Sequence, residues 1–236
     1  RELATGRTLT WRGMRAPDFS RDSRFLLLRG RPARGGGRSG GPGGPGGPSD
    51  SGDDDAGAGG TDAILVDLST GRSQLLGSVV DAAFSRAGDR LAYTVDAEAE
   101  DANGLYVIDL ASGRTAALDN DALTYAGLAW SEDGTGLAVL KGDDVAGKLH
   151  RHNVLLVVPD VDAALRDGTL APVTLDTTAA GFPAGWVISE DAPLTWSEEG
   201  GRVFLGARPQ RPASDTATVE ATDSTANVDV WSTADR

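Results

Sequence analysis

The sequence has no cysteine, only two histidines and no long apolar run. Without cysteine the chain cannot form disulfides, thiolate nucleophiles or cysteine-ligated metal sites. No apolar stretch approaches the roughly 18–20 residues that a membrane-spanning helix needs, so we expect no membrane insertion. Residues 1–7 lack the apolar segment of a signal peptide. The chain also starts without methionine and in the middle of a repeat, which indicates a processed chain or an excised fragment.

The chain is strongly acidic, with a net charge of −13 over 236 residues. This charge disfavours nucleic acid and anionic membrane surfaces as partners, and we expect it to serve solubility. Arg34 and Arg38 stand among glycines in a tract of the RGG kind, but the overall acidity argues against RNA binding.

One phrase recurs four times: an aromatic residue, a serine, a polar turn of about five residues and an apolar run. The copies begin at Phe19, Phe84, Trp130 and Trp196. A second phrase, of the form Leu-small-Ser/Thr-Gly-Arg, begins at Leu3, Leu68 and Leu110. Small polar residues followed by glycine between two apolar runs are typical of a hairpin in which glycine supplies a positive φ. The two phrases alternate along the chain.

The interval from Phe84 to Trp130 matches the ~40–50 residues of a four-stranded propeller blade, and the two outer intervals look like the same unit with insertions. We therefore predict an all-β propeller of four-stranded blades, present as an incomplete arc of about four blades. Its expected strands are 81–84, 90–95, 104–110 and 114–118 in the second blade, then 126–130, 137–141, 153–159 and 170–175 in the third. A helical turn is expected at 161–166, ended by Gly168.

The whole chain, 1–236, is predicted to be one partial propeller domain. Its expected parts are 1–10 (the end of a preceding blade), 11–78, 79–120, 121–178 and a truncated last blade, 179–236, whose third strand contains Val228–Trp231. The Gly/Pro-rich insertion 31–61 is expected to be disordered, and 210–226 is a second low-complexity insertion. Both should lie on the face opposite the two recurring turns. Unbroken apolar runs in the third strands predict sheets covered on both faces.

A catalytic triad or metal site is the first chemistry to test, and the sequence predicts none. His150 and His152, the only histidines, could approach one ligand, but a third metal ligand is missing and we expect a polar loop. No G-x-S-x-G elbow is present. We predict no catalytic, cofactor-binding or metal-binding residue in this chain.

Other candidates receive structural interpretations. The acidic runs Asp53-Asp54-Asp55 and Asp119-Asn120-Asp121 do not fit the calcium-loop pattern, so solvating or structural roles are expected. Asp22, Asp89 and Asp133 recur in the polar turn, where a carboxylate caps backbone N–H groups. Phe84, Trp130 and Trp196 are expected to pack blades together instead of forming a ligand cage.

The repeat resembles that of TolB-like propellers, which occur in TolB-type proteins and in the N-terminal propellers of prolyl oligopeptidase and dipeptidyl peptidase IV-like serine peptidases. Residues 181–190, 194–200 and 227–231 are similar to a bacterial branch of the prolyl oligopeptidase family, and the resemblance ends after Trp231. It implies a substrate-gating propeller beside a C-terminal α/β-hydrolase domain of the same polypeptide. No catalytic position of that family falls on this chain.

We therefore expect a propeller that is inactive alone, belonging to a periplasmic or secreted serine peptidase that hydrolyses peptides. The alternative is a TolB-type, non-enzymatic protein-binding propeller of the cell envelope. A metal-dependent propeller enzyme is a third hypothesis, and it needs clustered inward-facing ligands.

Overall fold

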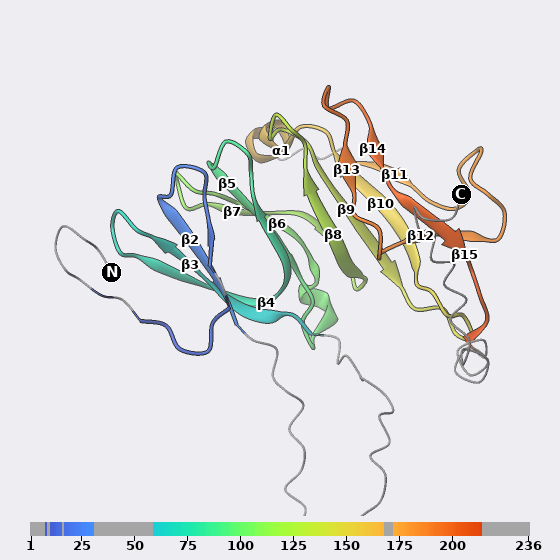
Figure 1. Ribbon diagram of the computed structural model, residues 1–236, viewed down its shortest axis with the longest axis horizontal. Coiled ribbons are helices and arrows are strands. Elements are labelled where there is room, and N and C mark those ends of the chain that lie inside the picture. The colour runs from blue at the N-terminus through green and yellow to red at the C-terminus, as the bar shows by residue number, and fades with distance from the viewer. Residues whose placement is uncertain (1–7, 9, 16, 31–58, 168–171, 214–236) are drawn as a thin grey trace, which may run out of the picture.

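The computed structural model describes residues 8, 10–15, 17–30, 59–167 and 172–213, and every structural statement below concerns these residues. They form a fan of antiparallel strands (Figure 1). The residues described leave out several that the sequence analysis interprets: most of 1–10, most of both insertions, and Arg34, Arg38, Asp53-Asp54-Asp55, Gly168 and Val228–Trp231. No helix in the described ranges is long and apolar enough to cross a membrane.

The first blade runs in the order β1-β2-β3-β4, all antiparallel. Its strands are β1 (Asp18–Phe19), β2 (Phe25–Arg29), β3 (Thr61–Asp67) and the first half of β4 (Ser73–Phe84). The second half of β4 pairs with β5 (Arg90–Val95) of the next blade. The register shifts on both sides of Ser78, whose φ is 51°. One bulged strand therefore serves two blades, which the sequence analysis did not foresee.

The second blade is completed by β6 (Gly104–Asp109) and β7 (Thr115–Asn120), with a short 3₁₀ turn η1 (Glu100–Ala102) before β6. The predicted strand 90–95 matches β5, and 104–110 is one residue too long. The predicted 114–118 begins one residue early and ends two residues early, because β7 pairs with β6 as far as Asn120. Gly71 and Gly113 both have a φ of 73°, so the predicted hairpin glycines are confirmed.

The third blade is a four-stranded sheet in the order β11-β10-β9-β8. Its strands are β8 (Thr124–Trp130), β9 (Leu137–Asp143), β10 (His152–Val158) and β11 (Val173–Leu175). The expected helical turn is α1 (Val161–Asp167), and the carboxylate of Asp160 accepts the Ala163 N–H at 2.9 Å at its start. Each predicted strand of this blade is confirmed within a few residues.

The fourth blade is described only as one interrupted hairpin. It consists of β12 (Trp186–Ser189), β13 (Thr195–Trp196), β14 (Val203–Phe204) and β15 (Gly206–Pro209). β12 pairs with β15, and β13 pairs with β14. Residues 190–194 therefore interrupt what is a continuous first strand in the third blade.

The core lies between blades instead of inside one sheet. Leu105 and Val107 of β6 face Leu156 and Val158 of β10 in one buried cluster. Ile108, also on β6, belongs to the cluster that contains Leu65 of the first blade. The third strand is thus covered on both faces, which confirms the prediction from its unbroken apolar run. Burial of this kind stabilises the arc by roughly 25 cal/mol per Å² of apolar surface.

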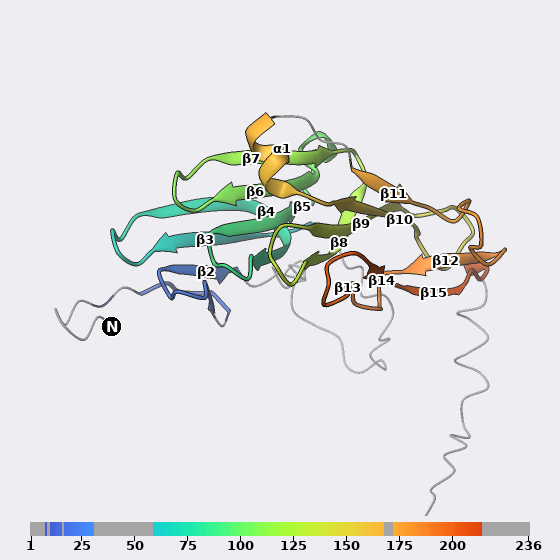
Figure 2. The ribbon, with the colours of Figure 1, turned by 90° about the horizontal axis from the view of Figure 1, so that it is seen from above.

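The two ends of the fan are open. Phe19 is 53% exposed on the outer side of the first blade, and Phe204 is 58% exposed on the outer side of the fourth. Figure 2 shows β2, β8 and β13 along one edge of the fan and β7 and β11 along the opposite edge. Blades of four strands that fan about one edge without closing confirm the predicted fold, a partial β-propeller.

Both insertions join the described chain on the same face. Gly60 donates its N–H to the carbonyl of Asp96, which follows β5. Pro212 forms a bridge with Lys148, in the loop between β9 and β10. Both attachment points thus lie beside loops that join the second and third strands of a blade, on the face predicted for them.

Candidate functional site

Three hollows on the described arc lie at its inner edge or between blades. One, of about 260 Å³, lies on the edge where the first strands of the blades meet. A second, of about 400 Å³, lies between the first and second blades, and a third, of about 550 Å³, lies between the third and fourth. In a propeller the first strands surround the central channel, so the hollow on this edge is the candidate functional site.

We call this site the axial rim and define it by Asp81, Ala82, Ala83, Gly127, Leu128, Pro193 and Leu194. It is built from irregularities in three successive first strands. The register shifts between Val79 and Ala82 in β4 and between Ala126 and Ala129 in β8. In the fourth blade, residues 190–194 take the same place between β12 and β13. Bulges commonly mark places where a strand turns its backbone toward a ligand or neighbour.

Asp81 ties the second and third blades together at this rim. Its Oδ2 accepts the backbone N–H of Gly127 at 3.0 Å. Gly127 has a φ of 71°, which a residue with a Cβ adopts only at a cost. The Asp81 N–H is in turn donated to Oγ1 of Thr94, which is fully buried. The rim is therefore held by side-chain bonds to backbone, with a fixed spacing between blades.

Charged groups flank the rim on the fourth blade. Arg151 pairs with Glu190 at 3.2 Å, and Arg208 pairs with Asp191 at 2.5 Å. These pairs are partly exposed, so each contributes little to stability, but they link the loop that carries Pro193 and Leu194 to neighbouring strands.

The rim has no constellation for bond cleavage. It contains one carboxylate and neither a histidine nor a serine. Among the described residues no group of three or more histidines, aspartates or glutamates is placed to hold a metal ion. The arrangement offers apolar side chains and one carboxylate for contact with another group.

The structure separates the two histidines. Nδ1 of His150 lies 3.5 Å from the Arg208 guanidinium, and its backbone carbonyl accepts the side-chain amide of Gln210. Nε2 of His152, at the start of β10, lies 3.1 Å from Oγ1 of Thr177. His150 therefore lies in the predicted polar loop, whereas His152 already belongs to β10, which begins one residue earlier than predicted.

The acidic run at 119–121 has a structural role, also as predicted. Oδ2 of Asp119 accepts the hydroxyl of the buried Tyr125 at 2.5 Å and the Lys141 ammonium at 2.9 Å, and Asp121 accepts the same ammonium at 3.2 Å. Burial, and then the bond to Asp119, raise the pKa of Tyr125. Burial alone would lower the pKa of Lys141, but the two carboxylates outweigh it and raise the pKa. The carboxylates hold a lysine in place of a calcium ion.

The recurring serine has the same role in all four blades. Its hydroxyl oxygen accepts the N–H of the residue five positions later, over 2.7–3.2 Å, in Ser20, Ser85, Ser131 and Ser197. In the first three blades the hydroxyl donates to an aspartate, respectively Asp22, Asp89 and Asp133.

The prediction for these aspartates is correct for two and wrong for the third. Asp22 and Asp133 accept the backbone N–H of Arg24 and Thr135, each at 3.1 Å. Asp89 stands four residues after its serine instead of two. Its carboxylate accepts the Ser85 hydroxyl and the Arg90 guanidinium instead, because the residue two positions later, Leu91, is already part of β5.

The recurring aromatics pack blades together, as predicted. Trp130 and Trp196 also donate their indole N–H to the preceding blade, to the carbonyls of Ala83 at 2.9 Å and Ala129 at 3.1 Å. Phe84 packs against the first-blade cluster and has no such donor. The sequence shows that the equivalent positions hold tryptophan in two blades and phenylalanine in another, so it indicates which of them have an indole donor. Only the structure shows which carbonyls accept.

The axial rim itself was missed. Gly127 inside an apolar run was its available signal, since an isolated glycine in a strand often marks a bulge.

No protein-family model matches the sequence, and no curated protein matches it. Solved structures do match. The chain is similar to dipeptidyl peptidase 4 from Porphyromonas gingivalis, at 11% identity and a TM-score of 0.57 over 88% of this chain and 31% of that one. It also matches TolB from Acinetobacter baumannii (18% identity, TM-score 0.44, 86% of this chain and 41% of that one). A third match is the β-propeller domain of the Trilobed protease from Pyrococcus furiosus (9% identity, TM-score 0.43, 85% of this chain and 56% of that one).

The first of these similarities supports the fold. This chain has the architecture of a propeller segment. It spans about a third of the length of the dipeptidyl peptidase that it matches.

Proposed function

We propose that this chain is the non-catalytic, substrate-gating propeller portion of a serine peptidase of the prolyl oligopeptidase type. The observation that carries the proposal is the axial rim, where three blades present a narrow, tied inner edge without catalytic groups. The overlap with dipeptidyl peptidase 4 and the sequence resemblance of residues 181–190, 194–200 and 227–231 support it. A ring of such blades admits an extended peptide along its axis and excludes a folded protein.

The catalytic groups then belong to an α/β-hydrolase domain of the same polypeptide. Such a domain supplies the serine nucleophile, its histidine base and the oxyanion hole, none of which the axial rim contains. In this proposal the protein works in the periplasm or outside the cell, which its sequence resemblance to TolB-type proteins supports.

A serine-directed fluorophosphonate probe tests the assignment to a peptidase. We expect the intact protein to be labelled at a serine outside residues 1–236 and to cleave a proline-containing chromogenic peptide. Residues 1–236 alone should show neither reaction. An intact protein without label or turnover would contradict the proposal and favour the non-enzymatic binding propeller.

Narrowing the rim tests the gating role. Pro193→Trp places a large side chain at the axial rim, so kcat/KM for a long peptide should fall several-fold more than kcat/KM for a dipeptide substrate. Val145→Trp, at an exposed position away from the rim, is the matched control. Equal losses for both substrates would remove gating from the proposal.

A further inference from the structure

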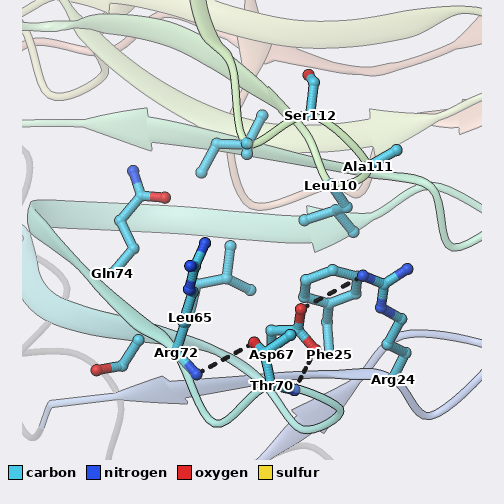
Figure 3. Close-up of a pocket in the computed structure, with 13 residues that line it drawn as sticks. Arg24, Phe25, Leu65, Asp67, Thr70, Arg72, Gln74, Leu110, Ala111 and Ser112 are labelled. Carbon is cyan, nitrogen blue, oxygen red and sulfur yellow. Dashed lines mark hydrogen bonds and ion pairs between the residues drawn. The ribbon is translucent and has the colours of Figure 1, made fainter.

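The boundary between the first two blades carries a hollow that the gating role does not use. We call it the outer groove, and its lining includes Ile108. Figure 3 shows five more of its lining residues, Arg24, Phe25, Leu65, Arg72 and Leu110. Its volume is about 400 Å³, within the range of about 300–1,000 Å³ that is usual for binding pockets.

At the next boundary the same place is filled by α1. Leu65 and Val107 occupy equivalent positions, since each lies on the third strand of its blade opposite the same site on the second strand, Leu27 and Ala92 respectively. Leu65 lines the outer groove, whereas Val107 shares a buried cluster with Val161 and Ala164 of α1.

An ion pair also holds α1 in place. Asp162 pairs with Arg90 of the second blade at 2.5 Å, and the Arg90 side chain is only 17% exposed. The position equivalent to Arg90 in the first blade is Phe25, which forms part of the groove floor. The protein thus shows which kind of segment suits such a boundary: a short helix with an apolar face and a carboxylate beside an arginine.

The outer groove is open because of one short connection. Residues 110–114 join β6 to β7 by a tight turn at Gly113, whereas residues 159–172 join β10 to β11 and include α1. The groove walls are the same structural elements in both boundaries, and the difference is the missing helix.

The rim of the groove is cationic, although the chain as a whole is acidic. Arg24 stacks over Phe25 at 5.0 Å and pairs with Asp67 at 3.3 Å, leaving 46% of its side chain exposed. The Arg72 side chain has no ion pair or hydrogen bond to any described residue. Figure 3 shows Arg24 and Arg72 on either side of Phe25 and Asp67. The surface therefore attracts a carboxylate over an apolar floor.

We propose that the outer groove binds a short, acidic, amphipathic helical segment of a separate partner protein. The segment places apolar side chains on Phe25, Leu65 and Leu110, as α1 does with Val161 and Ala164 at the next boundary. Its carboxylate lies against Arg72, because the position equivalent to Arg90 is Phe25 here. The apolar contact supplies the affinity, and the arginines set the orientation.

The probe is a labelled, stapled peptide copying residues 160–167 with Arg166→Glu, so that no cation faces the groove. Stapling is needed because an eight-residue peptide is not helical alone in water. We expect saturable binding to the intact protein by fluorescence anisotropy. Arg72→Glu should weaken it by roughly tenfold or more, since a like charge then faces the peptide. Ala111→Trp should weaken it similarly by filling the groove.

Arg114→Glu is the matched control, because Arg114 follows the hairpin glycine as Arg72 does, at the boundary that α1 already fills. Binding should stay within about twofold for this variant, because Arg114 is exposed and is not among the residues that line the outer groove. Absence of saturable binding, or equal losses from Arg72→Glu and Arg114→Glu, would overturn the proposal. Concentration-dependent self-association of the intact protein that Arg72→Glu abolishes would overturn it too, because the occupant would then be a second copy.

Discussion

Two blade boundaries can be compared: one between the first and second blades, the other between the second and third. They are built from equivalent strands and differ in their outer half. Both have a buried cluster, a stacked pair of polar turns and a third strand covered on both faces. Only the second has a helix over its outer half and an indole hydrogen bond across its inner half. The comparison teaches that a repeat fixes strand register, while the connection between two strands decides whether a boundary is filled or hollow.

Shortening a buried leucine should destabilise the protein more at the boundary filled by α1 than at the boundary with the outer groove. Leu156→Ala removes a side chain that is 1% exposed between the second and third blades. We expect a loss of about 3 kcal/mol in the free energy of unfolding, and about 2 kcal/mol for Leu65→Ala, whose cavity opens onto the outer groove. Urea unfolding measures both, with the exposed Leu68→Ala as a control expected to change little. Equal losses at the two boundaries would contradict the difference in filling.

The polar turns of the first two blades stack on each other, and two glycine substitutions can measure how much this contact contributes to stability. Gly88 has a φ of 80°, and an added Cβ would lie 3.1 Å from the Arg21 nitrogen of the preceding blade. Gly113 has a φ of 73° and open space around it. Gly113→Ala should therefore cost about 1 kcal/mol of left-handed strain, and Gly88→Ala about 2 kcal/mol because the blades must also move apart. Thermal unfolding of the two variants gives the difference, and identical melting temperatures would refute the stacking contribution.

Removing the indole donor should make the filled boundary resemble its neighbour. Trp130→Phe reproduces the side chain of Phe84 and leaves the Ala83 carbonyl without its indole partner. The expected loss is about 1 kcal/mol in the free energy of unfolding. Trp196→Phe should give a similar loss through Ala129. A neutral result for both would show that the aromatic rings act by packing alone.

The two equivalent hairpin aspartates should respond to pH in the same direction. The Ser69 hydroxyl holds the pKa of Asp67 well below its usual range, and the Ser112 N–H lowers the pKa of Asp109. Because both folded-state pKa values are depressed, their stabilisation is present above about pH 4 and is lost as the pH falls through the folded-state values.

We therefore expect Asp67→Asn and Asp109→Asn each to flatten the acid-induced loss of stability, with the larger change at Asp67, which also pairs with Arg24. Urea midpoints between about pH 6 and about pH 3 measure this. An unchanged slope in both variants would remove these carboxylates from the acid response.

Much of the fold could be predicted from the sequence because the repeat is local. The serine at each blade start, the hairpin glycines at 71 and 113 and the helical turn after Asp160 follow from short-range chemistry. The continuity of β4 could not be predicted, since it depends on how two blades share one bulged strand at Ser78.

The axial rim and the outer groove could not be predicted from the sequence, because both depend on contacts between blades. Asp81 meets Gly127 only when two first strands lie side by side. The outer groove depends on what the connection at 110–114 lacks when compared with 159–172. Neither fact is contained in any one repeat.

The most direct test of the propeller arc concerns its two open ends. Residues 1–236 contain no cysteine, so Phe19→Cys and Phe204→Cys introduce single thiols there. Thiol-labelling rates, mapped by mass spectrometry, can be compared between the intact protein and residues 1–236. If further blades cover both ends, each thiol should react at least roughly tenfold more slowly in the intact protein, as buried groups react only through local opening. Equal, fast labelling of both thiols in both forms would contradict an arc that belongs to a larger ring.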